Sequence, residues 1–491
     1  MADNTPGDSS TQPRIAIVGA GIAGLNAALT LQDAGIACSI YEASGHIGGR
    51  MRSDTTTWAD GMVTDLCGEF IDSDHDTLHA LIRRFGLSTV DLGKATAPGA
   101  QNILYLFNRY YSPDQVYQGF ETVGPILQQQ IQECGLPTTY NHYTDTGYRL
   151  DHMSAYDWVQ QYVTGGHDSP LGRMMNGACR GYFGLPTKEQ SSLNLLYMFG
   201  SWIDEDEGED EEDTPGSTGP MMGSIRIAGG NQQLPLAIAR SLPEGCIHLN
   251  HRLVSIRRES DDSVMLSFTT PSGSLKVSCH HAILTLPFST LREVDYSQAG
   301  FDALKQKAIQ ELGYGTISKL FLQFDTPYWY QQGPWPRNNS GFMITDLDIQ
   351  VVWDVSLGQP GSTGILVDYT SGEIGASYRP PAPYSTTRDS QVIQQYARHC
   401  LEELEKFLPG ISAHYTGVAA LNYPTGDPFL RGSYACWRVG QYTRFAGYEG
   451  IRQGPIHFAG EHCSVKWQGF MEGGAEEGAR AAREVLKGDL K

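Results

Sequence analysis

Three glycines and one carboxylate near the start of the chain have types and a spacing that could bind a nucleotide. Gly19, Gly21 and Gly24 form the pattern GxGxxG directly after a short apolar run. Glycines at these positions allow a tight turn, a close approach of the backbone to a pyrophosphate, and close packing of the next helix. Glu42 follows about twenty residues later, where a carboxylate can accept hydrogen bonds from ribose hydroxyls and repel a 2'-phosphate. These residues predict dinucleotide binding.

The elements that would position this motif are present on both sides of it. Residues 14–18 are rich in β-branched side chains, which favours a strand, and residues 22–34 have the apolar spacing of a helix. The first amide groups of that helix would face the phosphates with a favourable dipole. A second short strand, residues 38–41, ends directly before Glu42. An ordinary glycine-rich turn needs neither the helix nor the acid, so we interpret residues 14–50 as a nucleotide-binding βαβ unit.

Composition and charge limit the other classes of function. The 491-residue chain has a formal net charge of -20, which argues against binding to nucleic acid or to an anionic membrane surface. All residues of 204–213 except Gly208 are acidic, which predicts a solvated loop, with a partner-binding site as the alternative. Nine cysteines without CxxC spacing favour reduced thiols, and we expect no metal site. Residues 1–13 carry no secretory signal and no long apolar stretch follows, so the expected location is cytoplasmic.

The remaining periodicity predicts an α/β fold combined with an α+β region. A strand, a glycine turn and a helix recur at residues 224–240, and another short strand and helix lie at residues 456–486. We expect the last helix to pack against the first. The expected boundaries are 14–75, 224–297 and 440–488 for a discontinuous nucleotide-binding domain, 76–113 and 298–439 for a substrate-binding domain, and 114–223 for a helical domain with the acidic loop 204–213.

Four segments, taken in order, resemble those of flavin amine oxidases, and together they cover almost the whole chain. They are residues 14–52 with the extension Gly48-Gly49-Arg50, the GGNQQLP turn at 229–235, GTISKLFLQFDTPYW at 315–329, and FAGEHCSVKWQGFMEGGAEEGARAA at 458–482. The chain looks most like L-amino acid oxidases, with monoamine and polyamine oxidases close behind. The resemblance implies a discontinuous, Rossmann-like FAD-binding domain of the GR2 type that is interleaved with a substrate domain.

The resemblance implies FAD without a covalent link, because the cysteine that forms the link in the family is replaced here by Ser433. Glu461 matches the acid that binds a ribitol hydroxyl, and Val254 matches the position whose backbone contacts adenine. The implied cofactor-binding residues are Gly19, Ala20, Gly21, Ile22, Ala23, Gly24, Glu42, Ala43, Gly49, Arg50, Met51, Arg52, Gly68, Glu69, Phe70, Val254, Gly460, Glu461, Gly469, Phe470 and Met471.

Lys319 interrupts an apolar strand, and taken alone it would be a lysine that snorkels from a half-exposed face. The resemblance implies instead that Lys319 holds a water molecule near flavin N5. It also implies that Tyr369 binds the substrate carboxylate and that two aromatic residues flank the substrate amine. The implied catalytic residues are Lys319, Tyr369, Tyr434, Phe470 and Gly469, with Tyr434 and Phe470 as the flanking pair.

One segment departs from the pattern of many L-amino acid oxidases. Those enzymes have an arginine in a GMR-type segment, where its planar fork can bind a carboxylate through two hydrogen bonds. This chain has Glu69-Phe70-Ile71 there. Either another arginine, with Arg438 as the candidate, anchors the carboxylate, or the substrate has no carboxylate.

The function implied by the resemblance is oxidative deamination of L-amino acids with apolar or aromatic side chains. Hydride transfer from Cα to flavin N5 and reoxidation by O2 would give a 2-oxo acid, ammonia and hydrogen peroxide. The alternatives are a monoamine or polyamine oxidase, and a flavoprotein of the same fold that is not an oxidase. The expected partners are a small-molecule substrate and O2, with no nucleic acid and no membrane, in a homo-oligomer, a dimer.

Overall fold

The computed structural model describes residues 14–204 and 224–489 and contains two compact units. Within the described residues, unit 1 consists of 14–49, 235–309 and 448–489, and unit 2 consists of 50–204, 224–234 and 310–447. The acidic stretch 204–213 lies outside the described residues except for Asp204. The division into three domains stays a prediction.

Unit 1 is built on a five-stranded sheet in which every neighbouring pair is parallel, with the order β21-β13-β1-β2-β9. All residues of β1 are buried, as the continuous apolar run requires for a central parallel strand. The βαβ unit predicted from residues 14–50 is therefore present. The strands are β1 (Ile15–Val18), β2 (Cys38–Tyr41), β9 (Ile247–His248), β13 (His281–Leu284) and β21 (Ile456–Phe458).

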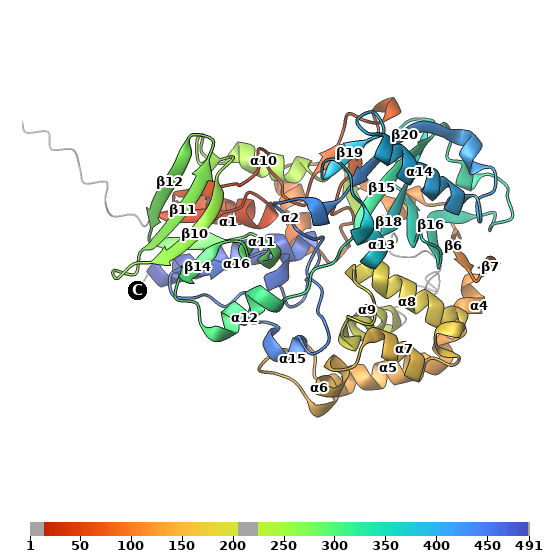
Figure 1. Ribbon diagram of the computed structural model, residues 1–491, viewed down its shortest axis with the longest axis horizontal. Coiled ribbons are helices and arrows are strands. Elements are labelled where there is room, and N and C mark those ends of the chain that lie inside the picture. Colours follow the sequence, from red (N-terminus) through yellow and green to blue (C-terminus); the bar gives the residue numbers. More distant parts are fainter. Residues whose placement is uncertain (1–13, 205–223, 490–491) are drawn as a thin grey trace, which may run out of the picture. The chain divides into compact units, whose positions relative to one another are not determined.

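The first and the last helix of unit 1 pack directly against each other (Figure 1). They are α1 (Ile22–Asp33) and α16 (Met471–Asp489). The side-chain amide of Asn26 donates a hydrogen bond of 2.7 Å to the Ala475 carbonyl. A Cβ atom at Gly478 would lie 2.1 Å from the Ala23 carbonyl oxygen, so a glycine is needed for this close approach. The predicted contact between the two helices is confirmed.

A second sheet of unit 1 has the order β12-β11-β10-β14 and is antiparallel except between β10 and β14. Its strands are β10 (Arg252–Arg258), β11 (Val264–Thr270), β12 (Gly273–Cys279) and β14 (Asp295–Gln298). The sequence patterns of residues 253–258, 264–269 and 275–278 predict three strands, which are confirmed by β10, β11 and β12. The other helices are α11 (Phe288–Leu291), α10 (Gln233–Ser241) and α12 (Ala303–Glu311), and the last two cross the boundary between the units.

Unit 2 is organised by an eight-stranded sheet with the order β19-β20-β15-β18-β17-β16-β6-β7, antiparallel except between β16 and β6. Its strands are β6 (Gln101–Leu106), β7 (Arg109–Tyr111), β15 (Ser318–Phe324), β16 (Asn339–Thr345), β17 (Val351–Asp354), β18 (Gly364–Thr370), β19 (Tyr384–Thr386) and β20 (Tyr415–Asn422). The sequence patterns of residues 317–324 and 364–369 predict strands, which are confirmed as β15 and β18. All seven residues of β15 are buried between β20 and β18.

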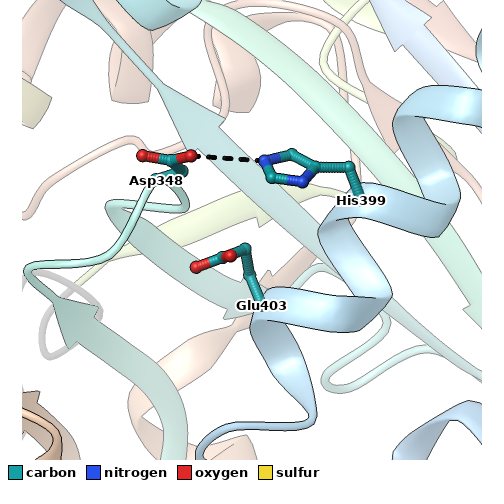
Figure 2. A group of neighbouring side chains, drawn as sticks. All are labelled: Asp348, His399 and Glu403. Atoms are coloured by element: carbon teal, nitrogen blue, oxygen red, sulfur yellow. Dashed lines mark ion pairs between the residues drawn. The ribbon is translucent and has the colours of Figure 1, made fainter.

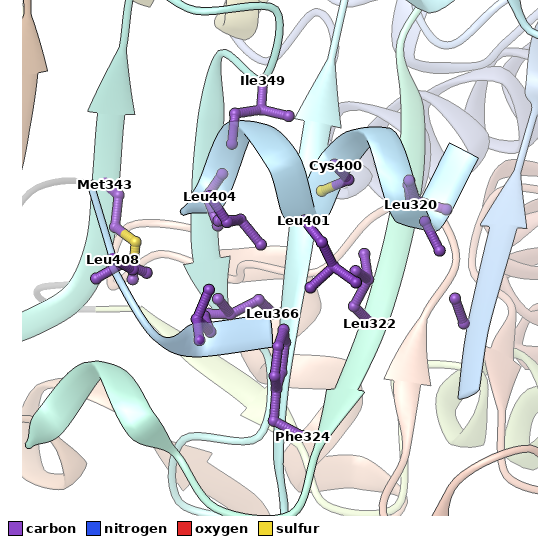
Figure 3. Close-up of a cluster of buried hydrophobic side chains, with 14 of the residues drawn as sticks. Leu320, Leu322, Phe324, Met343, Ile349, Leu366, Cys400, Leu401, Leu404 and Leu408 are labelled. Carbon is purple, nitrogen blue, oxygen red and sulfur yellow. The ribbon is translucent and has the colours of Figure 1, made fainter. Parts of the chain in front are cut away.

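Helix α14 (Gln391–Leu404) covers one face of this sheet and closes its hydrophobic core (Figure 3). Ser390 caps the helix, since its side chain accepts a hydrogen bond from the Val392 amide. The helix buries Leu401 and Leu404 in the same cluster as Leu322 of β15. This core holds β15 and β18 rigidly, and both strands carry predicted site residues.

The helical spacing predicted between residues 126 and 198 corresponds to helices of unit 2. Ser154 and Ser169 cap two of them, and Gly184, with φ of +77°, ends the second. The helices of this stretch are α4 (Pro113–Tyr117), α5 (Phe120–Cys134), α6 (Asp145–Asp151), α7 (Ala155–Tyr162), α8 (Pro170–Phe183) and α9 (Ser192–Asp204).

Shorter elements complete unit 2. They are α2 (Asp76–Arg84), α3 (Leu92–Ala95), α13 (Gly372–Ser377), α15 (Tyr442–Phe445) and the strand pairs β3 (Ser53–Asp54) with β4 (Thr64–Asp65) and β5 (Thr89–Asp91) with β8 (Ile225–Ile227). Among the helices in the described part of the chain, none is both long enough and apolar enough to cross a membrane. The cytoplasmic location stays a prediction.

Candidate functional site

The glycine turn of unit 1 has the geometry of a nucleotide-binding turn. Gly19 has φ of +109°, and a Cβ atom at Gly24 would lie 2.0 Å from the Gly19 carbonyl oxygen, so the fold itself requires both glycines. Gly21 is different, because its φ is -75° and an added Cβ would meet only the Gly49 Cα atom, at 3.9 Å. Gly21 also begins α1 without a side-chain cap. Space and uncapped helix amides at this point fit a pyrophosphate.

Glu42 is fixed beside this turn at the carboxyl end of β2. Its Oε2 atom accepts a hydrogen bond from the Ala20 amide at 2.8 Å, and its Oε1 atom accepts from the amide and the hydroxyl of Ser44 at 2.8 and 2.7 Å. Ala43, which lies between Glu42 and Ser44 in the chain, is partly buried. Ligands of open parallel sheets bind at the carboxyl ends of the strands, so the position of Glu42 fits a ribose-binding acid.

The segment that leads into α16 places two further predicted cofactor residues together. Gly460 has φ of +129°, and Glu461, which is buried, accepts a hydrogen bond of 2.8 Å from the Gly469 amide. Phe470 precedes Met471, the first residue of α16, and its ring lies edge-on to Trp467 with centroids 5.9 Å apart. Val254 lies in β10 of the same unit and is 39% exposed.

In unit 2, Lys319 lies in a buried cluster of charges. Its Nζ atom lies 2.8 Å from Glu69 Oε2 and 3.1 Å from the Asp65 carbonyl oxygen. Glu69 Oε1 also accepts hydrogen bonds from Arg226 Nη1 at 3.0 Å and from Trp353 Nε1 at 3.1 Å. Lys319 is 3% exposed, so the alternative of a lysine snorkelling from a half-exposed strand is wrong, because every residue of β15 is buried.

The charges of this cluster determine its protonation. Burial raises the pKa of the Glu69 carboxyl, but Lys319 and Arg226 outweigh that effect and hold the pKa below its usual value. The neighbouring Asp65 has its pKa raised to about 6, mainly by burial and further by the charge of Glu69. At neutral pH both carboxyls of the cluster are therefore mostly ionised.

Tyr369 and Tyr434 form a hydroxyl pair beside this cluster. Tyr369 is the partner of Lys319 in the pairing of β15 with β18, and its ring centroid lies 5.9 Å from Lys319 Nζ. The two tyrosine oxygens are 3.1 Å apart, and the Tyr434 hydroxyl also donates to the Tyr182 carbonyl. Burial raises the pKa of both tyrosines, so both hydroxyls stay neutral and can donate or accept hydrogen bonds.

A buried hydroxyl close to Tyr434 fits a polar ligand atom. Ser433 is 7% exposed, and its Oγ atom has no hydrogen-bond partner among the described residues. The Ser433 carbonyl accepts a hydrogen bond of 2.8 Å from Arg50 Nη1. The predicted cofactor loops meet here, because the Arg50 carbonyl accepts from the Gly68 amide at 3.2 Å.

Three other predicted cofactor residues of unit 2 lie in the same loops. Met51 is buried, and the Arg52 carbonyl accepts a hydrogen bond of 2.8 Å from the Leu66 amide. The ring centroids of Phe70 and Trp353 lie 5.6 Å apart, and Trp353 donates a hydrogen bond to Glu69.

The structure brings some predicted residues together and leaves others apart. Phe470 belongs to unit 1 and Tyr434 to unit 2, so their joint contact with a substrate stays a prediction. Arg438, the candidate carboxylate anchor, forms an ion pair of 3.3 Å with Glu189 in which both side chains are about half exposed. Arg226 was not among the predicted site residues, although an arginine between two isoleucines of a predicted strand is a signal of a buried charge.

Among the described residues, one group outside these sites has side chains of the metal-binding types. Asp348, His399 and Glu403 have ligand atoms within 4.8 Å of one another (Figure 2). Asp348 and His399 form an ion pair of 3.3 Å and are both more than half exposed, and Glu403 accepts a hydrogen bond of 2.6 Å from Lys406. These pairings account for the arrangement, and we assign no metal to it.

Comparison with known proteins identifies the family. The model of the flavin-containing amine oxidoreductases matches residues 22–486, and the chain therefore belongs to this family. The protein is an oxidoreductase that acts on amines with a flavin cofactor, and the predicted cofactor FAD is confirmed. Its non-covalent attachment stays a prediction.

Curated relatives share about a quarter of the sequence over almost its whole length. Putrescine oxidase of Kocuria rosea is 24% identical, and the alignment covers 98% of this chain and 96% of that protein. An L-amino-acid oxidase of Siganus canaliculatus is 25% identical, with 98% of this chain and 86% of that protein covered.

Solved structures confirm the predicted fold class. Putrescine oxidase bound to putrescine matches with a TM-score of 0.77 and 20% identity over 97% of this chain and 99% of that one. Cyclohexylamine oxidase from Brevibacterium oxydans matches with a TM-score of 0.78 and 19% identity over 98% and 100%. At this identity the likeness defines the fold and leaves the substrate open.

Proposed function

We propose that this protein is an L-amino acid oxidase that converts its substrate, with O2 and water, to a 2-oxo acid, ammonia and hydrogen peroxide. The observation that carries the proposal is the pair of neutral hydroxyls, Tyr369 and Tyr434, 3.1 Å apart beside the buried ammonium of Lys319. The Tyr434 hydroxyl already donates to the Tyr182 carbonyl, so a substrate carboxylate would accept a hydrogen bond from Tyr369 in exchange for the one that joins the two tyrosines. The nearby cation favours the negative charge of that carboxylate.

Each residue has a distinct part in the proposed reaction. When bound, FAD supplies the acceptor of the hydride from the substrate Cα and passes the electrons to O2. Tyr369 binds the substrate carboxylate, and Tyr434 with Phe470 flanks the amine and orients the Cα hydrogen. Lys319 holds a water molecule near the reacting centre. Apolar and aromatic substrate side chains fit the aromatic residues of this set.

We also propose that FAD is bound without a covalent link. Ser433 stands where the family's cysteinyl link would form, and a hydroxyl does not form the thioether that a cysteine would. Precipitation of the protein with acid should release all of the yellow cofactor into the supernatant. Colour that remains in the pellet would show a covalent bond to another residue.

A second candidate substrate class, amines without a carboxylate, is favoured by the arginines of unit 2. Arg226 is buried, and its guanidinium already binds Glu69 and the carbonyls of Val355 and Leu357 at 2.7 and 2.5 Å. Arg438 is paired with Glu189 at the surface. Neither offers an open fork to a carboxylate, and an amine substrate would not need one.

Anaerobic mixing of the purified yellow protein with candidate substrates separates the two classes. The panel contains apolar and aromatic L-amino acids, their D-enantiomers, and the amines that correspond to them without the carboxylate. We expect the L-amino acids to bleach the flavin absorbance much faster than either control set. Bleaching by the amines alone would exclude the amino acid oxidase and support the second candidate.

A further inference from the structure

We propose that Glu69 is a positioning residue that holds Lys319 as an ammonium and directs one of its hydrogens to a water molecule, an inference that rests on the role proposed for Lys319. An ammonium group has three donors. Lys319 Nζ gives one to Glu69 Oε2 at 2.8 Å and one to the Asp65 carbonyl at 3.1 Å. These two acceptors fix the direction of the third donor, which remains for water.

Glu69 is itself held firmly enough to fix the lysine. Arg226 and Trp353 both donate to Oε1, the oxygen that Lys319 does not use. Arg226 is anchored in turn by two main-chain carbonyls, those of Val355 and Leu357. The carboxylate is therefore bound on both oxygens by groups from three separate segments, and it cannot turn away without breaking several hydrogen bonds.

The charge of Lys319 depends on this carboxylate. Glu69, Arg226 and Lys319 are all less than 10% exposed, and a buried ammonium is unfavourable unless an anion compensates it. The chain contains a second buried lysine for comparison, whose charge Glu449 and Asp302 compensate only in part. Lys305 is also buried, its Nζ atom donates to the carbonyls of Tyr448 and Glu449, and burial lowers its pKa to about 8.

The other ionisable groups near Lys319 do not replace Glu69. Asp65 presents a main-chain carbonyl to Lys319, and its side chain accepts hydrogen bonds from Ser53 and Asn231. Burial raises the pKa of Cys67 and of Tyr369, so both are neutral near pH 7. Arg226 is a second cation and would repel an unpaired Lys319. Removing the Glu69 charge should therefore favour loss of the Lys319 proton.

The first test compares the melting temperature of the wild-type flavoprotein with that of Glu69→Gln between about pH 7 and about pH 10. The amide keeps the shape and removes the charge. The variant should melt at a lower temperature near neutral pH. The difference in melting temperature should shrink as the pH rises, because a lysine that loses its proton more easily in the folded than in the unfolded chain gains stability with rising pH.

The double variant Glu69→Gln with Lys319→Met should lose this shrinkage, because no lysine remains to be deprotonated. Glu311→Gln is the matched control, since Glu311 pairs with Arg444 at the surface and the same change there should leave the pH dependence as in the wild type. A melting difference for Glu69→Gln that is constant over the whole pH range would overturn the proposal, because it would mean that Glu69 only packs.

The second test is the pH profile of anaerobic flavin reduction by a substrate that bleaches the wild type. Glu69→Gln should acquire an additional ionisation that is absent from the wild type and from the double variant Glu69→Gln with Lys319→Met. An unchanged profile would overturn the positioning role even if the melting temperature moves. If no amine or amino acid reduces the flavin, the proposed function fails, whereas the melting comparison still decides whether Glu69 controls the charge of Lys319.

Discussion

Among the described residues, each of the two units buries one lysine, and the two lysines are stabilised by different means. In unit 1, Lys305 of α12 donates to two main-chain carbonyls, and its Nζ atom lies 3.9 Å from the centre of the Phe458 ring. In unit 2, Lys319 of β15 donates to the Glu69 carboxylate, which also binds Arg226. Burial is similar, at 0% and 3% exposure, so the difference lies in the partners.

This difference separates a structural lysine from a lysine placed for chemistry. Two carbonyls accept the hydrogen bonds of Lys305, and together with the Phe458 ring and the charges of Glu449 and Asp302 they compensate its charge only partly, so burial lowers its pKa to about 8. That is sufficient for holding α12 to the segment at residue 448. A full carboxylate at Lys319 provides the compensating charge that the carbonyls lack, which suits a residue that must orient water in front of a reacting centre.

The largest expected effect comes from removing the Glu69 carboxylate, which pairs with Lys319 in unit 2. Glu69→Leu leaves Arg226 and Lys319 buried without their shared carboxylate and should lower the free energy of unfolding by about 3–5 kcal/mol. Urea unfolding near neutral pH measures it. Glu311→Leu, at an exposed pair, should cost only about 0–1 kcal/mol. Equal losses of the free energy of unfolding in Glu69→Leu and Glu311→Leu would mean that Glu69 is not coupled to the buried charges of Arg226 and Lys319.

A smaller, pH-dependent effect is expected in unit 1. Lys305→Met removes the two hydrogen bonds that Nζ donates to the carbonyls of Tyr448 and Glu449 and should cost about 1–3 kcal/mol near neutral pH. The folded pKa of Lys305 lies below that of a lysine in the unfolded chain, so its contribution to stability is complete at high pH and is lost as the pH falls through about 8. The gap between wild type and variant should thus widen by up to about 1.4 kcal/mol per pH unit between about pH 8 and about pH 10. A gap that narrows over that range would contradict the lowered pKa.

The smallest expected effect concerns the hydroxyls next to Lys319. Tyr369→Phe removes one neutral hydrogen-bonding group and should weaken transition-state binding by about 1 kcal/mol, which lowers kcat/KM for an L-amino acid about fivefold. Flavin content and the melting temperature should change little. Tyr434→Phe serves as the comparison, since its hydroxyl also donates to the Tyr182 carbonyl. Loss of flavin in either variant would make the tyrosine a structural residue.

The sequence predicted unit 1 well because its signals are local. The glycines at 19, 21 and 24, the acid at 42 and the apolar runs of β1 and β2 lie within about thirty residues of one another, so their spacing can be read directly from the chain. The small residues of α16 likewise indicated its close contact with α1, which Gly478 confirms.

The sequence predicted less of unit 2 because its organisation depends on distant pairs. The strands β6, β16 and β17 carry mixed polar and apolar residues that are buried only because the sheet and its helices cover both faces. The pairing of Glu69 with Arg226 and with Lys319 spans 157 and 250 residues. No local pattern connects such residues, so Lys319 was interpreted through family resemblance and the role of Glu69 in holding it was missed.

The central claim, that the chain oxidises an L-amino acid with O2, is tested most directly by the products of turnover in air. Purified flavoprotein is mixed with an apolar L-amino acid, and the 2-oxo acid, ammonia and hydrogen peroxide are measured from the same sample. We predict that the three products form in equal molar amounts. One O2 should be consumed for each molecule of 2-oxo acid formed. Formation of 2-oxo acid without peroxide or oxygen uptake, or peroxide formed only from amines that lack a carboxylate, would contradict the account.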